Sequence, residues 1–314
     1  MSNLPELVNA RNHLKSLTVV RLMGGLGNQL FQYGFAISLK HKGYNIVLDT
    51  SWYSEGQEPS DAHFRKPDLL KLVPKAVQCG VTTRLPKTIL SKIIRRLQAG
   101  RASKGLRYLG NRNLQMIFDR QAGFDPSLYD VRGNVCIEGY FQDEKYIEPV
   151  RPDLLQLIEH VSGGVTPKQL FGENDCQTVS IHIRRGDYLK HSGTYPVCSP
   201  EYFYSAITEM RMRYSNPRFL IFTDDPDWFF LHRDEMSLDS TSILAKEHCS
   251  SDIDELVMMS RCDHHIISNS TFSWMGAWLN TAQDKFVIAP KQWMHGENYN
   301  SLNQSIVPGR WLRI

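Results

Sequence analysis

The sequence predicts an α/β protein with two Rossmann-like domains that face a cleft. Short apolar strands alternate with amphipathic helices in both halves of the 314-residue chain, and this alternation is typical of parallel sheets covered on both faces. Polar, glycine-containing segments at 162–164 and 172–177 interrupt the alternation, as a linker would. The boundary is therefore placed there, which gives an N-terminal domain of residues 1–170 and a C-terminal domain of residues 171–314.

The composition indicates a soluble globular protein, with 41% hydrophobic and 22% charged residues. The net charge of +3 is too small to favour nucleic acid as a partner. No apolar run approaches the roughly 18 residues of a membrane span, and Met1 to Leu17 lacks the central apolar block of a signal peptide. The six cysteines are scattered without a C-x-x-C pair, which favours reduced thiols in the cytoplasm and argues against a zinc site.

The first half opens with a βαβ unit. A strand at 18–23, a glycine-rich turn, a helix at 30–41 and a strand at 46–48 follow one another within about 30 residues. The turn contains Gly25 and Gly27 but not the third glycine of the dinucleotide fingerprint. Asp49 stands at the position where the ribose-binding acid of that fingerprint would be. A dinucleotide-dependent oxidoreductase is one alternative; more generally, such glycines let backbone N–H groups approach an anion or a sugar.

The segment 87–104 is basic, and its apolar residues recur at helical spacing. We interpret it as an ordinary amphipathic helix with a solvated basic face. The alternative is a helix that lies on a membrane surface. A strand at 135–141, which carries Glu138, Tyr140 and Gln142, and a helix at 153–161 complete the first half.

The second half repeats the alternation more clearly. Its expected strands are 178–183, 218–223, one near Ile243, 264–268 and 286–289, and its expected helices are 200–214, 252–262 and 271–280. Ser199 and Pro200 are typical residues for the start of the first of these helices.

The strand at 178–183 leads directly into Arg184, Arg185, Gly186 and Asp187. Ligands of open α/β sheets bind outside the carboxyl ends of strands, and an arginine fork matches phosphate in a bidentate geometry without losing its charge. This stretch is therefore interpreted as a phosphate site. The alternative is an arginine–aspartate ion pair that closes a surface loop.

Two further stretches carry candidate chemistry. The segment Ser268 to Trp274 places four hydroxyls and an amide at a strand-to-helix junction, which indicates an anion site; the alternative is a simple helix cap. Asp225 and Asp227 have the spacing of a divalent-cation site that could bridge a diphosphate. The proline after Asp225 also fits the capped start of a short helix, and we favour that interpretation.

These segments together resemble the alpha-1,2-fucosyltransferase family, glycosyltransferase family 11, in its bacterial form. The resemblance is carried by Gly24 to Tyr33, His182 to Tyr188 and Ile267 to Trp274, with Glu138 to Gln142 and Phe222 to Asp225 as two further blocks. The order and spacing match from about Val19 to Pro290. Met275 departs from the family, which often has tryptophan there.

The resemblance implies a GT-B fold and an inverting transfer of L-fucose from GDP-fucose to the 2-hydroxyl of a terminal β-galactose. It implies no metal and no other cofactor, and a place in surface-polysaccharide (O-antigen) assembly. The expected partners are GDP-fucose and a β-galactoside-terminated oligosaccharide or lipid-linked glycan, without nucleic acid. The basic segment 87–104 would allow a cytoplasmic enzyme to contact the inner face of the membrane.

The resemblance also assigns roles to residues. Arg184 would bind the donor diphosphate and Asp187 is one candidate base; Glu138 and Asp143 are the others. The remaining donor-side residues would be Gly25, Asn28, His182, Arg185, Asp224, Asn269, Ser270, Thr271 and Ser273. The acceptor-side candidates are Glu138, Tyr140 and Gln142.

Two further alternatives stay open at this point. One is a metal-dependent glycosyltransferase of another specificity that uses Asp225 and Asp227. The other is a non-catalytic protein that binds a sugar nucleotide or a glycan and turns nothing over.

Overall fold

The computed structural model describes residues 16–54, 65–73, 80–82, 106–109, 115–119, 123–161, 164–172 and 176–314, with the backbone alone for 80–82 and 106–109. The basic segment 87–104 lies outside these residues. In the part of the chain that is described, no helix is long and apolar enough to cross a membrane. Contacts between Cα atoms divide the chain into two compact units, Met1–Leu157 and Ile158–Ile314.

This division falls earlier than the boundary that the sequence predicts after residue 170. Two contacts connect the segment between these two boundaries, residues 158–170, to the rest of the second unit. Lys168 lies 3.4 Å from the carboxylate of Asp263, and the guanidinium of Arg261 donates to the carbonyl oxygen of Val161 at 3.4 Å. Such contacts between distant parts of the chain leave no mark in the local sequence pattern.

Among the described residues of the first unit, six strands form one sheet in the order β3-β2-β1-β6-β5-β4. The strands are β1 (Leu17–Arg21), β2 (Asn45–Asp49), β3 (Gly80–Thr82), β4 (Leu106–Leu109), β5 (Gln115–Phe118) and β6 (Val135–Glu138). All neighbours are parallel except β4 and β5, an antiparallel pair at the edge of the sheet that the sequence pattern does not predict. The order along the sheet reverses between β1 and β6.

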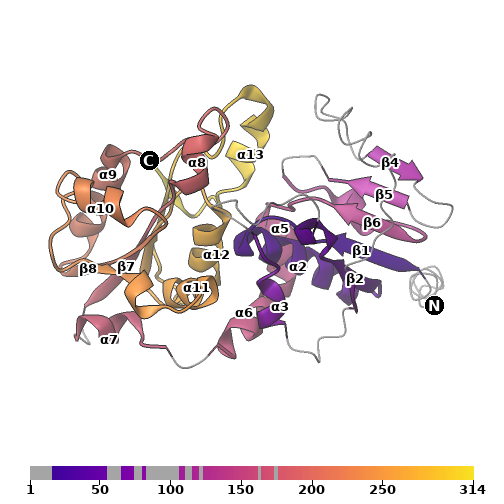
Figure 1. Ribbon diagram of the computed structural model, residues 1–314, viewed down its shortest axis with the longest axis horizontal. Helices are drawn as coiled ribbons and strands as arrows, with labels where there is room; N and C mark the ends of the chain where they lie inside the picture. Colours follow the sequence, from indigo (N-terminus) through magenta and orange to yellow (C-terminus); the bar gives the residue numbers. More distant parts are fainter. Residues whose placement is uncertain are drawn as a thin grey trace, which may run out of the picture. The chain divides into compact units, whose positions relative to one another are not determined.

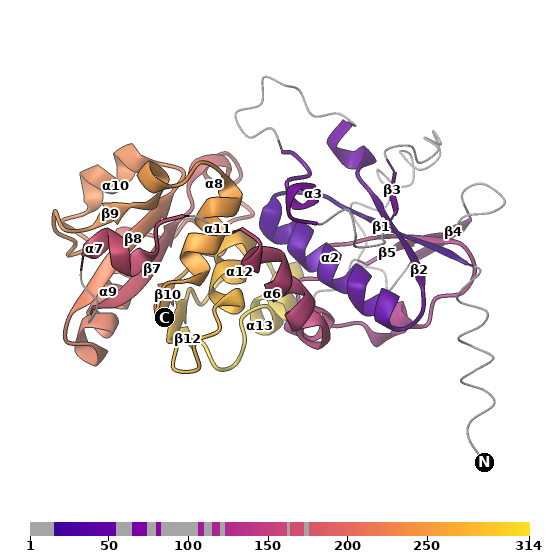
Figure 2. The ribbon, with the colours of Figure 1, turned by 90° about the horizontal axis from the view of Figure 1, so that it is seen from below.

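The helices of the first unit are α2 (Leu26–His41), α3 (Leu69–Leu72), α5 (Glu144–Ile147) and α6 (Arg151–Glu159), with 3-10 turns at Ser51–Ser54, Pro126–Tyr129 and Glu148–Val150. Helix α2 lies along β1 and β2 (Figure 2). It begins four residues earlier than predicted, because Gly25 is extended and serves as its N-cap. Its central residue Gly34 lets Ile147 of α5 approach closely.

In the described part of the second unit, six strands form one sheet in the order β12-β11-β10-β7-β8-β9, and every neighbouring pair is parallel. The strands are β7 (Gln177–Ile183), β8 (Pro217–Thr223), β9 (Ile243–Leu244), β10 (His264–Ile266), β11 (Val287–Ala289) and β12 (Leu312–Arg313). Counted from β7, the spatial order is 3-2-1-4-5-6, which is the doubly wound order. The predicted α/β fold with parallel sheets is therefore confirmed.

The helices of the second unit are α7 (Pro167–Phe171), α8 (Gly186–Lys190), α9 (Pro200–Arg213), α10 (Pro226–His232), α11 (Asp252–Ser260), α12 (Thr271–Leu279) and α13 (Asn300–Ser305), with 3-10 turns at Ala245–His248 and Glu297–Tyr299. Helices α9 and α10 cover one face of β7 and β8, and α11 and α12 cover the other (Figure 1). Strand β8 shows this alternation directly, because Phe219 and Ile221 join one apolar cluster and Leu220 and Phe222 the other.

Candidate functional site

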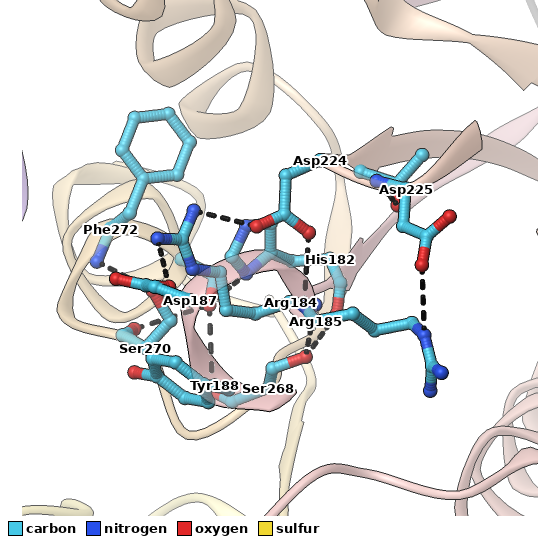
Figure 3. A network of polar contacts seen from close by, with 12 residues as sticks. His182, Arg184, Arg185, Asp187, Tyr188, Asp224, Asp225, Ser268, Ser270 and Phe272 are labelled. Atoms are coloured by element: carbon cyan, nitrogen blue, oxygen red, sulfur yellow. Dashed lines mark hydrogen bonds and ion pairs between the residues drawn. The ribbon is translucent and has the colours of Figure 1, made fainter. Parts of the chain in front are cut away.

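The candidate site lies at the switch point of the second sheet, where β7 and β10 are neighbours and the strand order reverses. In doubly wound sheets, ligands bind outside the carboxyl ends of the strands at this point. Arg184 follows β7, Ser268 follows β10 and Asp224 follows β8. Figure 3 shows these residues gathered with Asp187 and Tyr188 into one network of polar contacts.

Arg184 is at the centre of this network. Its Nη2 lies 2.5 Å from Oδ1 of Asp187, and its Nη1 lies 2.8 Å from Oδ2 of Asp224. The side chain is 16% exposed. Two carboxylates on two different nitrogens fix the plane of the guanidinium, so the donor group is oriented before any ligand arrives.

Arg185 turns away from Arg184 and has a different role. Its Nε lies 3.2 Å from the carboxylate of Asp225, and its guanidinium lies 4.1 Å from the ring centroid of Trp228. Its backbone N–H donates to Asp224 at 2.9 Å. Arg185 therefore joins the loop after β7 to the start of α10.

Asp225 caps helix α10, because its carboxylate accepts the backbone N–H of Trp228 at 3.1 Å. The interpretation of this stretch as the capped start of a short helix is thus confirmed. Asp227 is exposed within the same helix. Among the residues that the structure describes, no group of three or more histidine, cysteine, aspartate or glutamate side chains is arranged to hold a metal ion.

His182 is buried beneath the network, and its Nδ1 lies 2.9 Å from Oγ of Ser273. Burial, and then the positive charge of Arg184, lower the pKa of the imidazole to about 3, so His182 is neutral at physiological pH. Its carbonyl oxygen accepts the hydroxyl of Ser268 at 2.5 Å, while Oγ of Ser268 accepts the N–H of Arg184 at 3.3 Å. The histidine thus connects strand β7 to the start of α12.

The segment after β10 divides into two parts. Asn269 is 1% exposed, and its amide donates to the carbonyl oxygens of Pro196 and Trp293; these bonds hold three loops together and use the donors that a phosphate would need. Ser270 is the N-cap of α12 and accepts the N–H of Phe272 at 3.4 Å. Thr271 begins the helix and is half-buried, so the helix start is the part of this segment best placed for an anion.

Glu255 in α11, which the sequence interpretation did not single out, has a shifted pKa. Burial, with the nearby carboxylates of Asp252 and Asp224, raises the pKa of its side chain to about 7, although Lys246 opposes this shift. It follows Asp252 and Asp254 in the first turn of the helix. Acidic residues there normally balance the helix dipole, so its place beside Asp224 has no separate signal in the sequence.

The first unit gathers its own candidate residues at the switch point between β1 and β6. The amide of Gln142 donates to Oδ1 of Asn28 at 2.9 Å, which joins the segment after β6 to the first turn of α2. The guanidinium of Arg65 lies against Gly25, at 3.3 Å from the position that a Cβ would take. Tyr140 is 46% exposed.

Glu138 lies at the end of β6 and pairs with Arg21, whose Nη1 is 3.2 Å from its carboxylate. The same arginine donates from Nε to Asp49 at 2.7 Å. Asp49 is fully buried and also accepts the hydroxyl and the N–H of Ser51. Its carboxylate is therefore committed inside the protein, which does not support the role of a ribose ligand in a dinucleotide site. Asp143 in turn caps α5 by accepting the N–H of Lys145.

The fold and the site define a doubly wound α/β protein with an arginine-centred polar site at the switch point. The chain belongs to glycosyl transferase family 11, whose family model matches residues 123–314. It is accordingly a glycosyltransferase, and the resemblance found in the sequence is confirmed.

Relatives agree with this membership. The chain is 27% identical over 314 aligned residues to an alpha-1,2-colitosyltransferase of Escherichia coli, with 95% of this chain and 99% of the relative covered. It is 28% identical over 300 residues to the O-antigen biosynthesis glycosyltransferase WbnK of Escherichia coli, with 90% and 96% covered. Among solved structures, the fucosyltransferase NodZ from Bradyrhizobium is 12% identical with a TM-score of 0.43, and the match covers 84% of this chain and 92% of NodZ.

Proposed function

We propose that the protein transfers L-fucose from GDP-fucose to the 2-hydroxyl of a terminal β-galactose, with inversion and without a metal, in the assembly of a surface polysaccharide such as an O-antigen. The observation that carries this proposal is the guanidinium of Arg184, held by two carboxylates at the switch point of the second sheet. Membership of family 11 and the O-antigen glycosyltransferase among the relatives support it.

In this proposal, the donor diphosphate lies against Arg184 and the start of α12, which supply a fixed cation and the positive end of a helix. Three carboxylates, of Asp187, Asp224 and Asp225, surround the two arginines. Diphosphate binding therefore requires Arg184 to exchange at least part of a carboxylate contact for a phosphate contact.

We propose that the guanine base lies near Glu255, whose carboxylate interacts electrostatically with that of Asp224. Guanine presents two neighbouring N–H donors, N1–H and N2–H, to which one carboxylate can accept in a bidentate geometry. A half-buried glutamate suits this role, because the partner N–H groups replace the water that burial has removed from the carboxylate.

The reaction is a single displacement. The 2-hydroxyl oxygen of the acceptor forms a bond to C1 of fucose, the bond from C1 to the β-phosphate oxygen breaks, and GDP leaves with the bonding pair. The transition state has oxocarbenium character, and negative charge grows on the diphosphate. Arg184 then stabilises the transition state more than the ground state, which is the requirement for catalysis.

A general base would accept the proton of the acceptor hydroxyl. Asp187, Glu138 and Asp143 are the candidates. The carboxylate of Asp143 is engaged as the cap of α5, and both Asp187 and Glu138 are partly exposed, at 28% and 16%. We therefore favour Asp187 or Glu138 and leave the choice between them to mutagenesis.

The test is GDP release from GDP-fucose in EDTA, with and without lactose as a β-galactoside acceptor. The proposal expects release that depends on the acceptor and continues in EDTA. Release that appears only after manganese is added would instead support the metal-dependent alternative at Asp225 and Asp227. Tight GDP binding without turnover, across a panel of β-galactosides, would support the binding-protein alternative.

A second donor deserves the same assay, because a relative aligned over 95% of this chain is named a colitosyltransferase. Colitose is fucose without its 3-hydroxyl, so GDP-fucose and GDP-colitose differ at one position of the sugar. Comparing kcat/KM for the two donors with one acceptor decides which sugar the protein prefers.

A further inference from the structure

Beyond Arg184, a row of tyrosines continues along the same edge of the second unit. Tyr188 stands one turn after Arg184 in the chain, and the guanidinium lies 5.6 Å from its ring centroid. The hydroxyl of Tyr188 donates to the carbonyl oxygen of Asn269 at 2.9 Å, which fixes the ring beside Asp187 (Figure 3).

Tyr195 stacks on Tyr188, with ring centroids 4.7 Å apart and planes inclined by 21°. Its loop, residues 191–199, is joined to the loop 294–299 by a backbone hydrogen bond from His295 to Thr194 at 2.8 Å. Burial, with Tyr299 and Asp187 nearby, raises the pKa of the Tyr195 phenol. The half-buried rings of Tyr188 and Tyr195 are thus stacked near Asp187, and Tyr299, about 100 residues further along the chain, is half-buried near Tyr195.

The position of this row relative to Arg184 indicates which part of a sugar nucleotide the row would contact. A nucleoside diphosphate sugar has its base at one end, its sugar at the other and the diphosphate between them. Arg184 contacts Asp224 through one nitrogen and Asp187 through another. Glu255 interacts electrostatically with Asp224, whereas Tyr188 follows Asp187 in the chain and its ring is stacked on that of Tyr195.

The chemistry of the row also suits a deoxyhexose. One face of such a pyranose carries mainly C–H groups and a methyl group, and its edge carries hydroxyls. Ligand sites of this kind combine aromatic surface with a few polar groups that fix orientation. Here the aromatic surface comes from Tyr195 and Tyr299, and the polar groups are the carboxylate of Asp187 and the phenol hydroxyls.

We propose that Tyr195, together with Tyr188, Tyr299 and Asp187, forms the subsite for the 6-deoxyhexosyl group of the donor. This inference rests on the proposed function, because it places the diphosphate at Arg184 and the guanine near Glu255. It adds a set of residues that would determine which sugar the protein accepts, on a loop whose sequence carries no motif for that role.

The test compares two ligands, GDP and GDP-fucose, whose affinities are measured by calorimetry for the full-length protein and for Tyr195→Ala. The Kd of GDP should stay within about twofold, while the Kd of GDP-fucose should rise roughly tenfold, the scale of one lost aromatic contact. Tyr195→Phe keeps the ring and should retain most of the GDP-fucose affinity. Tyr299→Ala is a second variant, in case Tyr195→Ala fails to fold.

Tyr204→Ala is the control, because Tyr204 is 48% exposed on α9 and belongs neither to the arginine network nor to the row of tyrosines. It should change neither affinity. Equal losses for GDP and GDP-fucose in Tyr195→Ala would place the base on the tyrosines and overturn the inference. An unchanged GDP-fucose affinity with a raised KM for the acceptor would assign the row to the acceptor and also overturn it. Failure of wild-type protein to bind GDP at all would instead refute the proposed function.

Discussion

Nη1 of Arg184 lies 2.8 Å from Oδ2 of Asp224, a residue 40 positions further along the chain at the end of the neighbouring strand. The pair orients the guanidinium, but it also places a negative charge next to the proposed diphosphate position. These two effects act in opposite directions on catalysis and on ground-state binding, and a single substitution separates them.

For Asp224→Asn we expect kcat to fall about tenfold, because Arg184 loses a charge-assisted hydrogen bond. GDP binding should be unchanged or tighter, since the repelling carboxylate is gone. Steady-state kinetics and a GDP titration measure the two quantities. Asp227→Asn is the control, and a large loss of activity in that variant would favour the metal-dependent alternative. An unaltered kcat in Asp224→Asn would show that Asp224 does not position Arg184.

The adjacent arginines provide an internal comparison. Arg184→Ala should lower kcat by ~10²–10³-fold, the range for losing one group that stabilises transition-state charge. Arg185→Ala should leave kcat within a few-fold and lower the free energy of unfolding by about 1 kcal/mol, because it breaks a partly buried ion pair and a cation–π contact. Turnover in EDTA and urea unfolding measure both effects. Similar kinetic losses in the two variants would contradict the assignment of Arg184 as the diphosphate ligand.

Strands and helices marked by regularly spaced apolar residues were predictable from the sequence, including several short ones of the second unit, whereas elements without such a pattern were not. Strand β7 is buried along nearly its whole length, and Val179, Ile181 and Ile183 alternate along it, and α9 begins at Pro200 as expected. The two-residue strand β12 was not predicted, because it is too short for any periodicity to show, whereas β9 lies where a strand was expected near Ile243. Their place depends on pairing with β8 and β11.

The candidate site, too, was predictable only in part from the sequence. The sequence places Arg184 and Asp187 at a strand end, and strand-end rules are local. The sequence interpretation assigns Asn269 to ligand binding. In the structure, its side-chain amide donates instead to the carbonyl oxygens of Pro196 and Trp293, which are 73 and 24 residues away in the chain. The stacking of Tyr195 on Tyr188 likewise depends on the path of a loop, which residue type and spacing do not specify.

Helix α2 offers a test of packing in the first unit. At Gly34 a Cβ would lie 2.6 Å from Cγ2 of Ile147, well inside van der Waals contact. Gly34→Ala should therefore lower the free energy of unfolding by about 1–2 kcal/mol, because overpacking outweighs the gain in helix propensity. Urea unfolding measures it, with Gly309→Ala as the control, since nothing lies within 4 Å of a Cβ there. A Gly34→Ala variant as stable as wild type would mean that α5 can move away from α2.

Glu255 gives a prediction that depends on pH. Its pKa is raised to about 7 in the folded protein, from the ordinary glutamate value of 4.5, so between these values the folded state holds a proton that the unfolded state has released. Stability then decreases as pH rises through this window. Glu255→Gln resembles the protonated form and removes this dependence. Near pH 5, wild type and Glu255→Gln should have the same free energy of unfolding.

Near pH 8, Glu255→Gln should be the more stable protein by up to about 3 kcal/mol, since one pKa unit corresponds to about 1.4 kcal/mol and partial exposure reduces the full effect. All other titrating groups are shared, so the difference between the two urea-unfolding profiles isolates this carboxyl.

The affinity for GDP should respond to pH in the opposite sense. If guanine N–H groups pair with the ionised carboxylate, the affinity of wild type for GDP should rise as pH passes 7, whereas that of Glu255→Gln should be weaker and should lack this rise. Parallel unfolding profiles would refute the raised pKa, and parallel GDP profiles would remove Glu255 from the nucleotide site.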